Sequence, residues 1–152
     1  MGFSLDFYTS HNQFYIFDKA SNGNTGSDRF WTEDAYNDRL AIEDGILGVG
    51  TECYGPIKGE VTILTTKKEP IEFDLYDHIV EGGIEIKSGT IQILDCPSSE
   101  VHLELNVKPG FYRTRIYSIN LASVNGDEGE DSYRIEIWSA SEMERKVLKR
   151  YS

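Results

Sequence analysis

The chain has 152 residues, a length that suits one domain of ordinary size, and its 15 basic and 26 acidic side chains give a net charge of −11. Nucleic acids and anionic membranes repel a molecule of this charge, so we expect direct binding to neither. The acidity is concentrated in residues 1–107, which hold 19 acids and 7 bases, whereas residues 108–152 hold 7 acids and 8 bases.

The N-terminus shows no positively charged start followed by an apolar run, and no stretch approaches about eighteen consecutive apolar residues. We therefore expect a soluble, cytoplasmic protein that forms one domain, residues 1–152. Cys53 and Cys96 lie in apolar segments, where buried thiols are common, and we expect no disulfide between them.

The first third of the chain predicts two strands, a loop and a helix. Phe3–Tyr8 and Gln13–Phe17 are predicted to pair at a sheet edge through a polar turn. Residues 19–29 are rich in Ser, Asn, Gly and Asp, which is typical of a loop. Thr32 can cap a helix whose apolar side chains recur on one face, and Gly45 is a plausible residue to end it.

From Ile46 onward the composition favours strands again. Ile46–Tyr54 and Gly59–Thr66 are rich in Val, Ile and Thr, with turn residues between them, and predict a second hairpin. Ile71–Leu75 predicts a short strand, and residues 76–80 a helical turn or a bend. Two further strands are predicted over Ile84–Lys87 and Thr90–Leu94.

The clearest pattern in the chain is the alternation of apolar and polar residues over Val101–Val107, which predicts a half-buried strand. Pro109 and Gly110 suit the central positions of a type II turn, so we expect the chain to reverse there. The return strand, Phe111–Leu121, is unusually long and alternates imperfectly. We therefore expect it to bend and to serve two sheets.

The end of the chain contains an acidic loop, residues 122–132, and a well-patterned strand, Tyr133–Trp138. Residues 141–151 could form a short C-terminal helix, because Glu142 and Lys146 are four residues apart. About eight or nine short strands with frequent turns and one clear helix indicate a mainly β protein. The predicted fold is an antiparallel β-sandwich with one helix across an edge and a possible short C-terminal helix.

The residues that could bind a metal form no recognisable site. Four carboxylates, those of Asp127, Glu128, Glu130 and Asp131, could attract calcium, but their spacing does not match an EF-hand loop. A hydrated surface loop is the preferred interpretation. The three histidines and two cysteines lack the paired spacing of a zinc site. We therefore predict no metal and no cofactor.

No catalytic motif is present either. The chain contains neither G-x-S-x-G nor a catalytic-cysteine signature. The pairs Ser10-His11 and Asp77-His78 are sequence neighbours, whose side chains point to opposite faces of a strand. Gly48 and Gly50 lack the strand–loop–helix context of a phosphate-binding loop. We predict that the protein is not an enzyme.

Three segments, residues 10–21, 30–52 and 101–121, resemble the competence protein J family, which is similar to the inhibitor of a DNA-uptake nuclease in transforming bacteria. The similarity lies within residues 10–121 of the chain. It is carried by His11, Gln13, Phe14, Phe17, Trp31, Thr32, Ala35, Ala41, Asp44, Gly45, Pro109, Gly110 and Tyr112.

The resemblance and the net charge suggest the same function: an acidic inhibitor or immunity-type partner of a nuclease or another basic protein. Carboxylates spaced like phosphates could occupy a basic nuclease cleft. Tyr36 or Trp138 could supply the buried anchor. The candidate partner-binding residues are Glu33, Asp34, Asp38, Glu43, Asp44, Asp127, Glu128, Glu130 and Asp131.

Three alternatives remain open from the sequence. The same carboxylates could simply be solubilising surface charges. The protein could be a calcium- or ligand-binding β-sandwich module that uses the residues from Asp127 to Asp131. It could also be a hydrolase with an unrecognised carboxylate or Ser/His site.

Overall fold

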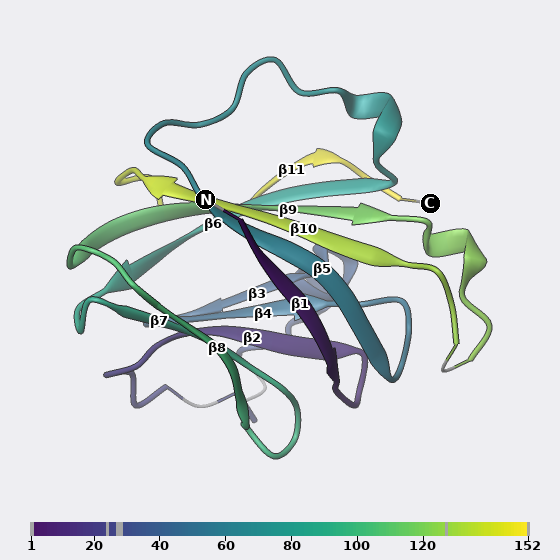
Figure 1. Cartoon of the computed structure of the whole chain (residues 1–152), viewed down its shortest axis with the longest axis horizontal. Coiled ribbons are helices and arrows are strands. Elements are labelled where there is room, and N and C mark those ends of the chain that lie inside the picture. Colours follow the sequence, from purple (N-terminus) through teal and green to yellow (C-terminus); the bar gives the residue numbers. More distant parts are fainter. Residues whose placement is uncertain (1, 24, 27–28, 127, 152) are drawn as a thin grey trace.

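Two β-sheets packed face to face make up most of the protein (Figure 1). The structure is a computed structural model, and it describes residues 2–23, 25–26, 29–126 and 128–151. One sheet has six strands, in the order β1 (Gly2–Tyr8), β5 (Pro56–Ile63), β10 (Ser132–Ser139), β9 (Gly110–Ile119), β6 (His78–Ile86) and β11 (Lys146–Lys149). The other has five, in the order β3 (Leu40–Glu43), β4 (Ile46–Gly50), β2 (Gln13–Asp18), β7 (Thr90–Leu94) and β8 (Val101–Asn106). The predicted mainly β sandwich is confirmed, although β5 and β10 pair in parallel.

The helix α1 begins where the sequence predicts but is much shorter than predicted. It spans Glu33–Asp38, and the Oγ1 of Thr32 accepts a hydrogen bond from the backbone N–H of Ala35 at 3.1 Å. Arg39 adopts the left-handed conformation and ends the helix. Residues 40–43 form β3, and Asp44 and Gly45 make the turn of a hairpin with β4. The Asp-Gly pair is therefore a hairpin turn, with Gly45 at a φ of +73°, and not a helix terminus.

The three predicted hairpins are wrong, because each pair of consecutive strands is split between the two sheets. β1 pairs with β5, whereas β2 lies between β4 and β7. β4 and β5 separate in the same way, and so do β8 and β9. Each of these turns carries the chain from one layer to the other. Alternation of apolar residues predicts one buried face per strand, and a facing sheet satisfies that requirement as well as a hairpin partner does.

The second half of the chain contains three further differences. The strand predicted over residues 71–75 is replaced by a single 3-10 turn, Phe73–Leu75. The turn predicted over residues 76–80 is instead the start of β6, which runs straight through Gly82 and Gly83. The strand β11, at the sheet edge beside β6, takes the place of the predicted C-terminal helix. β9 does not serve two sheets, since it pairs with β6 and β10 along its length.

Close packing explains the glycine pair inside β6. A Cβ added at Gly82 would lie 2.8 Å from the Cδ2 of Leu40, and one added at Gly83 would lie 2.5 Å from the Cα of Met143. Both faces of the strand are thus covered, one by the second sheet and one by the segment before β11. Glycine marks a close approach here and not a turn.

The apolar core lies between the two sheets. Phe14, Ile16 and Val49 contribute from the five-stranded sheet, and Ile116 and Ile135 are among the contributors from the six-stranded sheet. All of these side chains are buried. Phe14 and Tyr112, two of the residues that carry the resemblance, lie in this core, whereas Trp31 is only half-buried.

The outer face of the six-stranded sheet carries a buried cluster of charged residues. The two carboxylate oxygens of Glu81 accept hydrogen bonds from Arg113 Nε at 3.0 Å and from Arg115 Nε at 2.6 Å. The two arginines also donate to backbone carbonyl oxygens of residues 68, 142 and 144. These segments cover the sheet on the side of β11 (Figure 1). No helix in the described part of the chain is long and apolar enough to cross a membrane.

Candidate functional site

Two of the predicted acidic residues on α1 are exposed, but the third is not available. Glu33 and Asp34 lie in the first turn and face solvent. Asp38 is only 17% exposed at its side chain, and it accepts hydrogen bonds from Arg145 Nε at 2.7 Å and Arg150 Nη2 at 2.6 Å. Asp38 thus holds the basic C-terminal tail and presents little charge to a partner.

Glu43 and Asp44 lie at the opposite end of β3 from α1. Glu43 is the last residue of this strand, and Asp44 forms the turn to β4. Asp44 is well exposed, and its Oδ2 lies 3.9 Å from the Nζ of Lys87. These two carboxylates are therefore separated from Glu33 and Asp34 by the length of the strand, roughly 13 Å for four residues.

The acidic loop of residues 122–132 contains both exposed and buried carboxylates. Glu128 and Glu130 are exposed, whereas Asp127 lies outside the described residues. Asp131 is 5% exposed, and its Oδ2 accepts hydrogen bonds from the Cys53 backbone N–H at 3.2 Å and the Tyr133 hydroxyl at 2.6 Å. Asp131 is thus a structural residue, because its carboxylate accepts hydrogen bonds from two buried donors. It is not exposed for binding a partner.

The two aromatic residues predicted as anchors differ in exposure. Tyr36 on α1 is 73% exposed. Trp138 is 5% exposed, and the guanidinium carbon of Arg115 lies over its ring at 5.1 Å. Trp138 therefore packs within the molecule and cannot anchor a partner.

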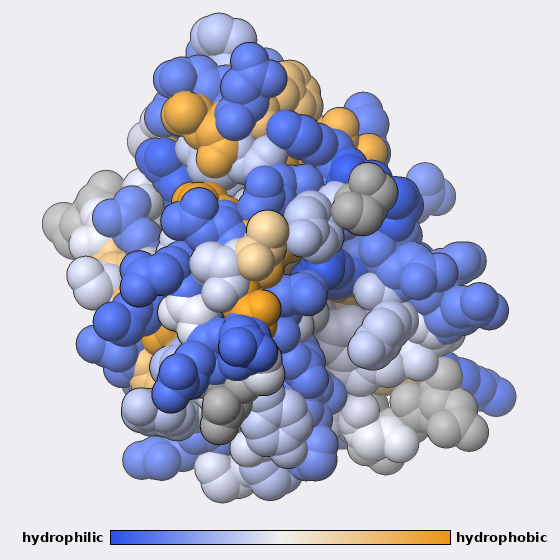
Figure 2. All heavy atoms as spheres, turned by 90° about the vertical axis from the view of Figure 1, so that its right-hand side faces the viewer, coloured by the Kyte–Doolittle hydropathy of each residue, from blue (hydrophilic) through white to orange (hydrophobic). Residues whose placement is uncertain are grey.

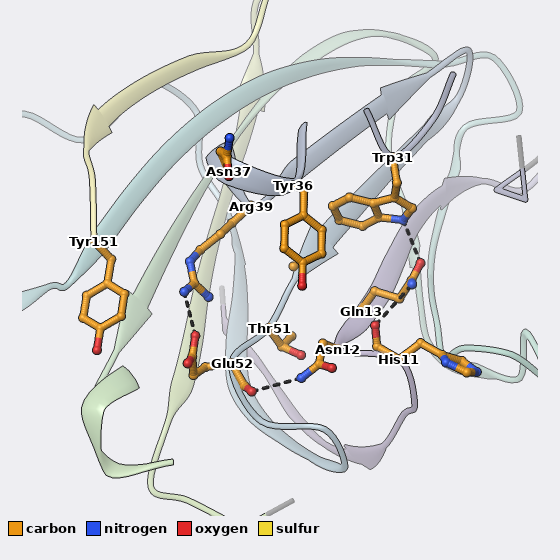
Figure 3. A pocket seen from close by; sticks show the side chains of 11 residues that line it. His11, Asn12, Gln13, Trp31, Tyr36, Asn37, Arg39, Thr51, Glu52 and Tyr151 are labelled. Atoms are coloured by element: carbon orange, nitrogen blue, oxygen red, sulfur yellow. Dashed lines mark hydrogen bonds and ion pairs between the residues drawn. The ribbon is translucent and has the colours of Figure 1, made fainter. Parts of the chain in front are cut away.

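A pocket of about 540 Å³ opens beside Tyr36, within the size range of ligand-binding pockets (Figure 3). It lies where the start of β2, the helix α1, the end of β4 and the C-terminus meet. It is lined by His11, Asn12, Gln13, Trp31, Tyr36, Asn37, Arg39, Gly50, Thr51, Glu52 and Tyr151.

Local backbone geometry positions several of these side chains. His11 and Asn12 both have φ near +60° and form the two-residue turn before β2, as in a type I′ turn. The left-handed conformation of Arg39 ends α1 and joins it directly to β3. The Arg39 carbonyl oxygen accepts a hydrogen bond from the backbone N–H of Gly50, so helix and sheet meet at the pocket.

Hydrogen bonds hold the polar lining in place. The Oε1 of Gln13 accepts hydrogen bonds at 2.7 Å from both the indole of Trp31 and the hydroxyl of Tyr15. The Nη2 of Arg39 contacts the Oε1 of Glu52 at 2.6 Å, and its guanidinium lies 5.4 Å from the centre of the Tyr151 ring. The pocket thus combines aromatic faces with one fixed ion pair, an arrangement that can bind a planar polar group.

Exposed tyrosines continue this surface beyond the pocket. Tyr8 is 74% exposed, and the next residue, Thr9, donates its backbone N–H to the carbonyl oxygen of Gly55. Tyr54 contacts His11 edge to face, with 6.1 Å between ring centres. Figure 2 shows that the right-hand end of the molecule in Figure 1 is mainly hydrophilic, with several apolar side chains near the top of the view. We call Tyr8, His11, Trp31, Tyr36 and Tyr54 the aromatic rim.

A potential metal-binding group lies elsewhere, on β8 and the loop before it. Asp95, Glu100 and His102 place one ligand atom each within 4.8 Å of one another. The Nε2 of His102 already contacts the Oδ2 of Asp95 at 2.8 Å, and its ring stacks on Phe7. Hydrogen bonds thus account for the geometry of this group.

The same group does not resemble a hydrolase triad. The hydroxyl of Ser98 donates to the Oδ1 of Asp95 at 2.6 Å, so the carboxylate lies between the hydroxyl and the histidine. Burial disfavours ionisation of Asp95, but the hydrogen bonds from Ser98 and His102 outweigh it and hold the pKa of Asp95 below its usual value. An ionised carboxylate in this position orients its neighbours and does not activate the hydroxyl.

Sequence reasoning missed most of the pocket. It singled out Tyr36 but gave no role to Arg39, Glu52 or Tyr151, which come from three separate segments. The resemblance did contain a signal, since His11, Gln13 and Trp31 belong to its matched positions and all line the pocket. Only the folded chain shows that these three residues meet.

The fold and the site together define a two-layer β-sandwich protein with an aromatic pocket at one end. Neither protein-family models nor curated protein sequences match the chain. Two solved structures share its fold. ComJ from Bacillus subtilis, an inhibitor of the DNA-degrading activity of NucA, has a TM-score of 0.68 at 19% identity, over 91% of this chain and 96% of ComJ.

The second solved structure is the protein of crocagin biosynthetic gene J, with a TM-score of 0.58 at 15% identity. That match covers 93% of this chain and 98% of the other. The chain therefore has a ComJ-like fold, which agrees with the resemblance seen in the sequence.

Proposed function

We propose that the protein is a non-catalytic interaction protein that binds and inhibits a nuclease or another basic protein. The observation that carries this proposal is the shared fold with ComJ, whose solved structure is that of a nuclease inhibitor, over 91% of the chain. The net charge of −11 supports a basic partner, because opposite charges steer association.

The pocket end of the sandwich is the best candidate for the binding surface. Protein-binding hot spots are enriched in Tyr, Trp and Arg, and the aromatic rim and Arg39 supply all three residue types. Glu33 and Asp34 lie on the helix that carries Tyr36. Glu128 and Glu130 lie just before Asp131, which is hydrogen-bonded to Cys53 beside the pocket residue Glu52.

This arrangement gives the predicted residues different roles. Glu33, Asp34, Glu128 and Glu130 would steer a basic protein toward the surface, and Tyr36 would supply buried contact area once the complex forms. Glu43 and Asp44 lie at the other end of β3 and serve as controls. Asp38 and Asp131 are held by internal contacts and are not proposed as contacts with the partner.

Capture from an extract of the source cell tests the function. The wild-type protein should retain a basic protein, and that protein's DNA cleavage should be inhibited at equal molar ratio if it is a nuclease. A variant with Glu33, Asp34, Glu128 and Glu130 changed to Lys should lose this capture, whereas changing Glu43 and Asp44 to Lys should preserve it. Retention of no basic protein, or unimpaired capture by the fourfold variant, would contradict the proposal.

A further inference from the structure

A recurrent feature of this molecule is a carboxylate that binds two arginines. Glu81 contacts Arg113 and Arg115 through its two oxygens, at 3.0 and 2.6 Å. Asp38 contacts Arg145 and Arg150 in the same way, at 2.7 and 2.6 Å. Each of the two oxygens of a carboxylate can accept a hydrogen bond from a guanidinium group. In Glu81 and in Asp38, each oxygen binds one arginine.

Glu52 in the pocket has only half of such an arrangement. Its Oε1 is bound to Arg39 at 2.6 Å, whereas its Oε2 accepts no hydrogen bond from any residue that the structure describes. The side chain is 37% exposed and belongs to the lining of the pocket (Figure 3). One acceptor of a fixed carboxylate is therefore open to the pocket.

The walls around Glu52 suit a second guanidinium group. In Figure 3 the ring of Tyr36 stands between Arg39 and Trp31, with its hydroxyl pointing into the pocket. The side-chain amide of Asn12 donates to the backbone oxygen of Glu52, and its own carbonyl oxygen accepts no hydrogen bond within the described residues. The face of Tyr151 already packs against the guanidinium of Arg39. Arginine stacks readily on aromatic faces of this kind.

We propose that the pocket receives an arginine side chain presented by the basic partner. This proposal rests on the proposed function and adds the chemistry that the partner must carry. The guanidinium would donate to Glu52 Oε2 and pack on the ring of Tyr36, so that Glu52 binds two arginines as Glu81 and Asp38 do. Lysine lacks the planar fork that can stack and donate at the same time, so arginine is favoured over lysine.

A titration with blocked amino acids tests the pocket without a partner. The probes are the N-acetyl amides of arginine, lysine and citrulline, which is the uncharged isostere of arginine. The chain has two tryptophans, and NMR can resolve their indole N–H signals. Trp31 lines the pocket, whereas Trp138 is buried on the outer face of the six-stranded sheet and serves as an internal reference.

We expect the arginine probe to shift the Trp31 signal in a saturable way and to leave the Trp138 signal unchanged. Lysine and citrulline probes should bind at least about tenfold more weakly, because each lacks either the planar fork or the charge. Glu52→Gln and Tyr36→Ala should both abolish the shift. Glu43→Gln and Phe111→Ala, two changes outside the pocket and outside the aromatic rim, should preserve it. An unchanged Trp138 signal in each variant would show that the fold is intact.

The outcomes separate this proposal from the proposed function. If the wild-type protein captures a basic partner but the arginine probe leaves Trp31 unchanged, or if lysine binds equally well, the arginine pocket is wrong and the interaction function stands. If the arginine probe binds but no basic partner is captured, the pocket chemistry is correct and the inhibitor function is wrong. Preferential binding of citrulline would also overturn the pocket proposal, because it would indicate a neutral ligand.

Discussion

His78 is a fully buried histidine whose two ring nitrogens are both engaged. Its Nε2 lies 2.8 Å from the backbone oxygen of Asp38, and its Nδ1 lies 3.1 Å from the backbone nitrogen of Tyr151. A carbonyl oxygen can only accept and a backbone N–H can only donate, so the ring is the neutral tautomer protonated at Nε2. A proton added at Nδ1 would face the Tyr151 N–H and break its hydrogen bond.

Burial lowers the pKa of His78, and the charges of Arg39 and Arg150 lower it further, although Asp38 opposes them. The unfolded chain takes up this proton at about pH 6.5, before the folded protein does. The contribution to the free energy of unfolding is therefore complete above about pH 6.5 and is lost as the pH falls from there through the folded value.

We predict that the wild-type protein is less stable at pH 5.5 than at pH 7.5, and that His78→Gln reduces this difference. Glutamine can supply one donor and one acceptor without titrating in this range. Urea unfolding at the two pH values measures the effect. The buried aspartates contribute little to the stability difference between these two pH values, because an aspartate in the unfolded chain protonates only at about pH 3.9. An identical pH dependence in the variant would refute the role given to His78.

The buried contacts of Glu81 lead to a second prediction at the residue scale. Glu81→Ala would leave Arg113 and Arg115 buried without their shared counter-charge, so the free energy of unfolding should fall by about 3–5 kcal/mol. Glu60→Ala, an exposed change on β5, should alter it by less than about 0.5 kcal/mol. Chemical denaturation of both variants provides the comparison, and equal stabilities would show that the cluster contributes little.

At the scale of elements, α1 and β11 depend on each other. α1 has only six residues, too few for an isolated helix to be stable in water. Its last residue, Asp38, binds Arg145 and Arg150 on either side of β11, and the Asn37 carbonyl oxygen accepts a further hydrogen bond from Arg150. The basic tail thus fastens the helix to the edge of the six-stranded sheet and brings Tyr151 into the pocket.

Removal of the Asp38 carboxylate should therefore loosen the tail more than it destabilises the whole protein. Burial raises the cost of ionising Asp38, but the hydrogen bonds from Arg150 and Arg145 outweigh this cost and lower its pKa. We expect Asp38→Ala to cost about 1–3 kcal/mol and to speed amide exchange in residues 146–149. Asp34→Ala is the matched control, because Asp34 is exposed on the same helix. Equal exchange in the two variants would argue against the fastening role.

At the scale of the whole molecule, the net charge of −11 predicts how association with a basic partner responds to salt. Steering by exposed charges acts on the association rate and is screened as the Debye length shrinks from about 30 Å at 0.01 M to about 8 Å at 0.15 M. Once a partner is captured, its association rate constant should fall about tenfold or more over this range, with a much smaller change in the dissociation rate constant. Stopped-flow mixing measures both, and a salt-independent association rate would contradict steering.

Much of the fold could be predicted from the sequence because the relevant signals are local. Alternation identified the strands Thr90–Leu94 and Ser132–Ser139 closely, and Thr32 was correctly identified as a helix cap. The pairing of the strands could not be predicted, because it depends on residues that are far apart in the sequence. β1 and β2, like β8 and β9, are joined by short turns but belong to different sheets, and the alternation of either strand is satisfied in both arrangements.

Composition and pattern by themselves determined an acidic, mainly β chain with one capped helix, since charge and periodicity are properties of residues and their immediate neighbours. Only the tertiary structure decided which carboxylates are exposed, because the arginines that bind Asp38 and the Cys53 backbone N–H that binds Asp131 lie more than 70 residues away in the sequence. It alone also assembled the pocket, whose lining residues His11, Glu52 and Tyr151 are brought together by the packing of two sheets and the C-terminal tail.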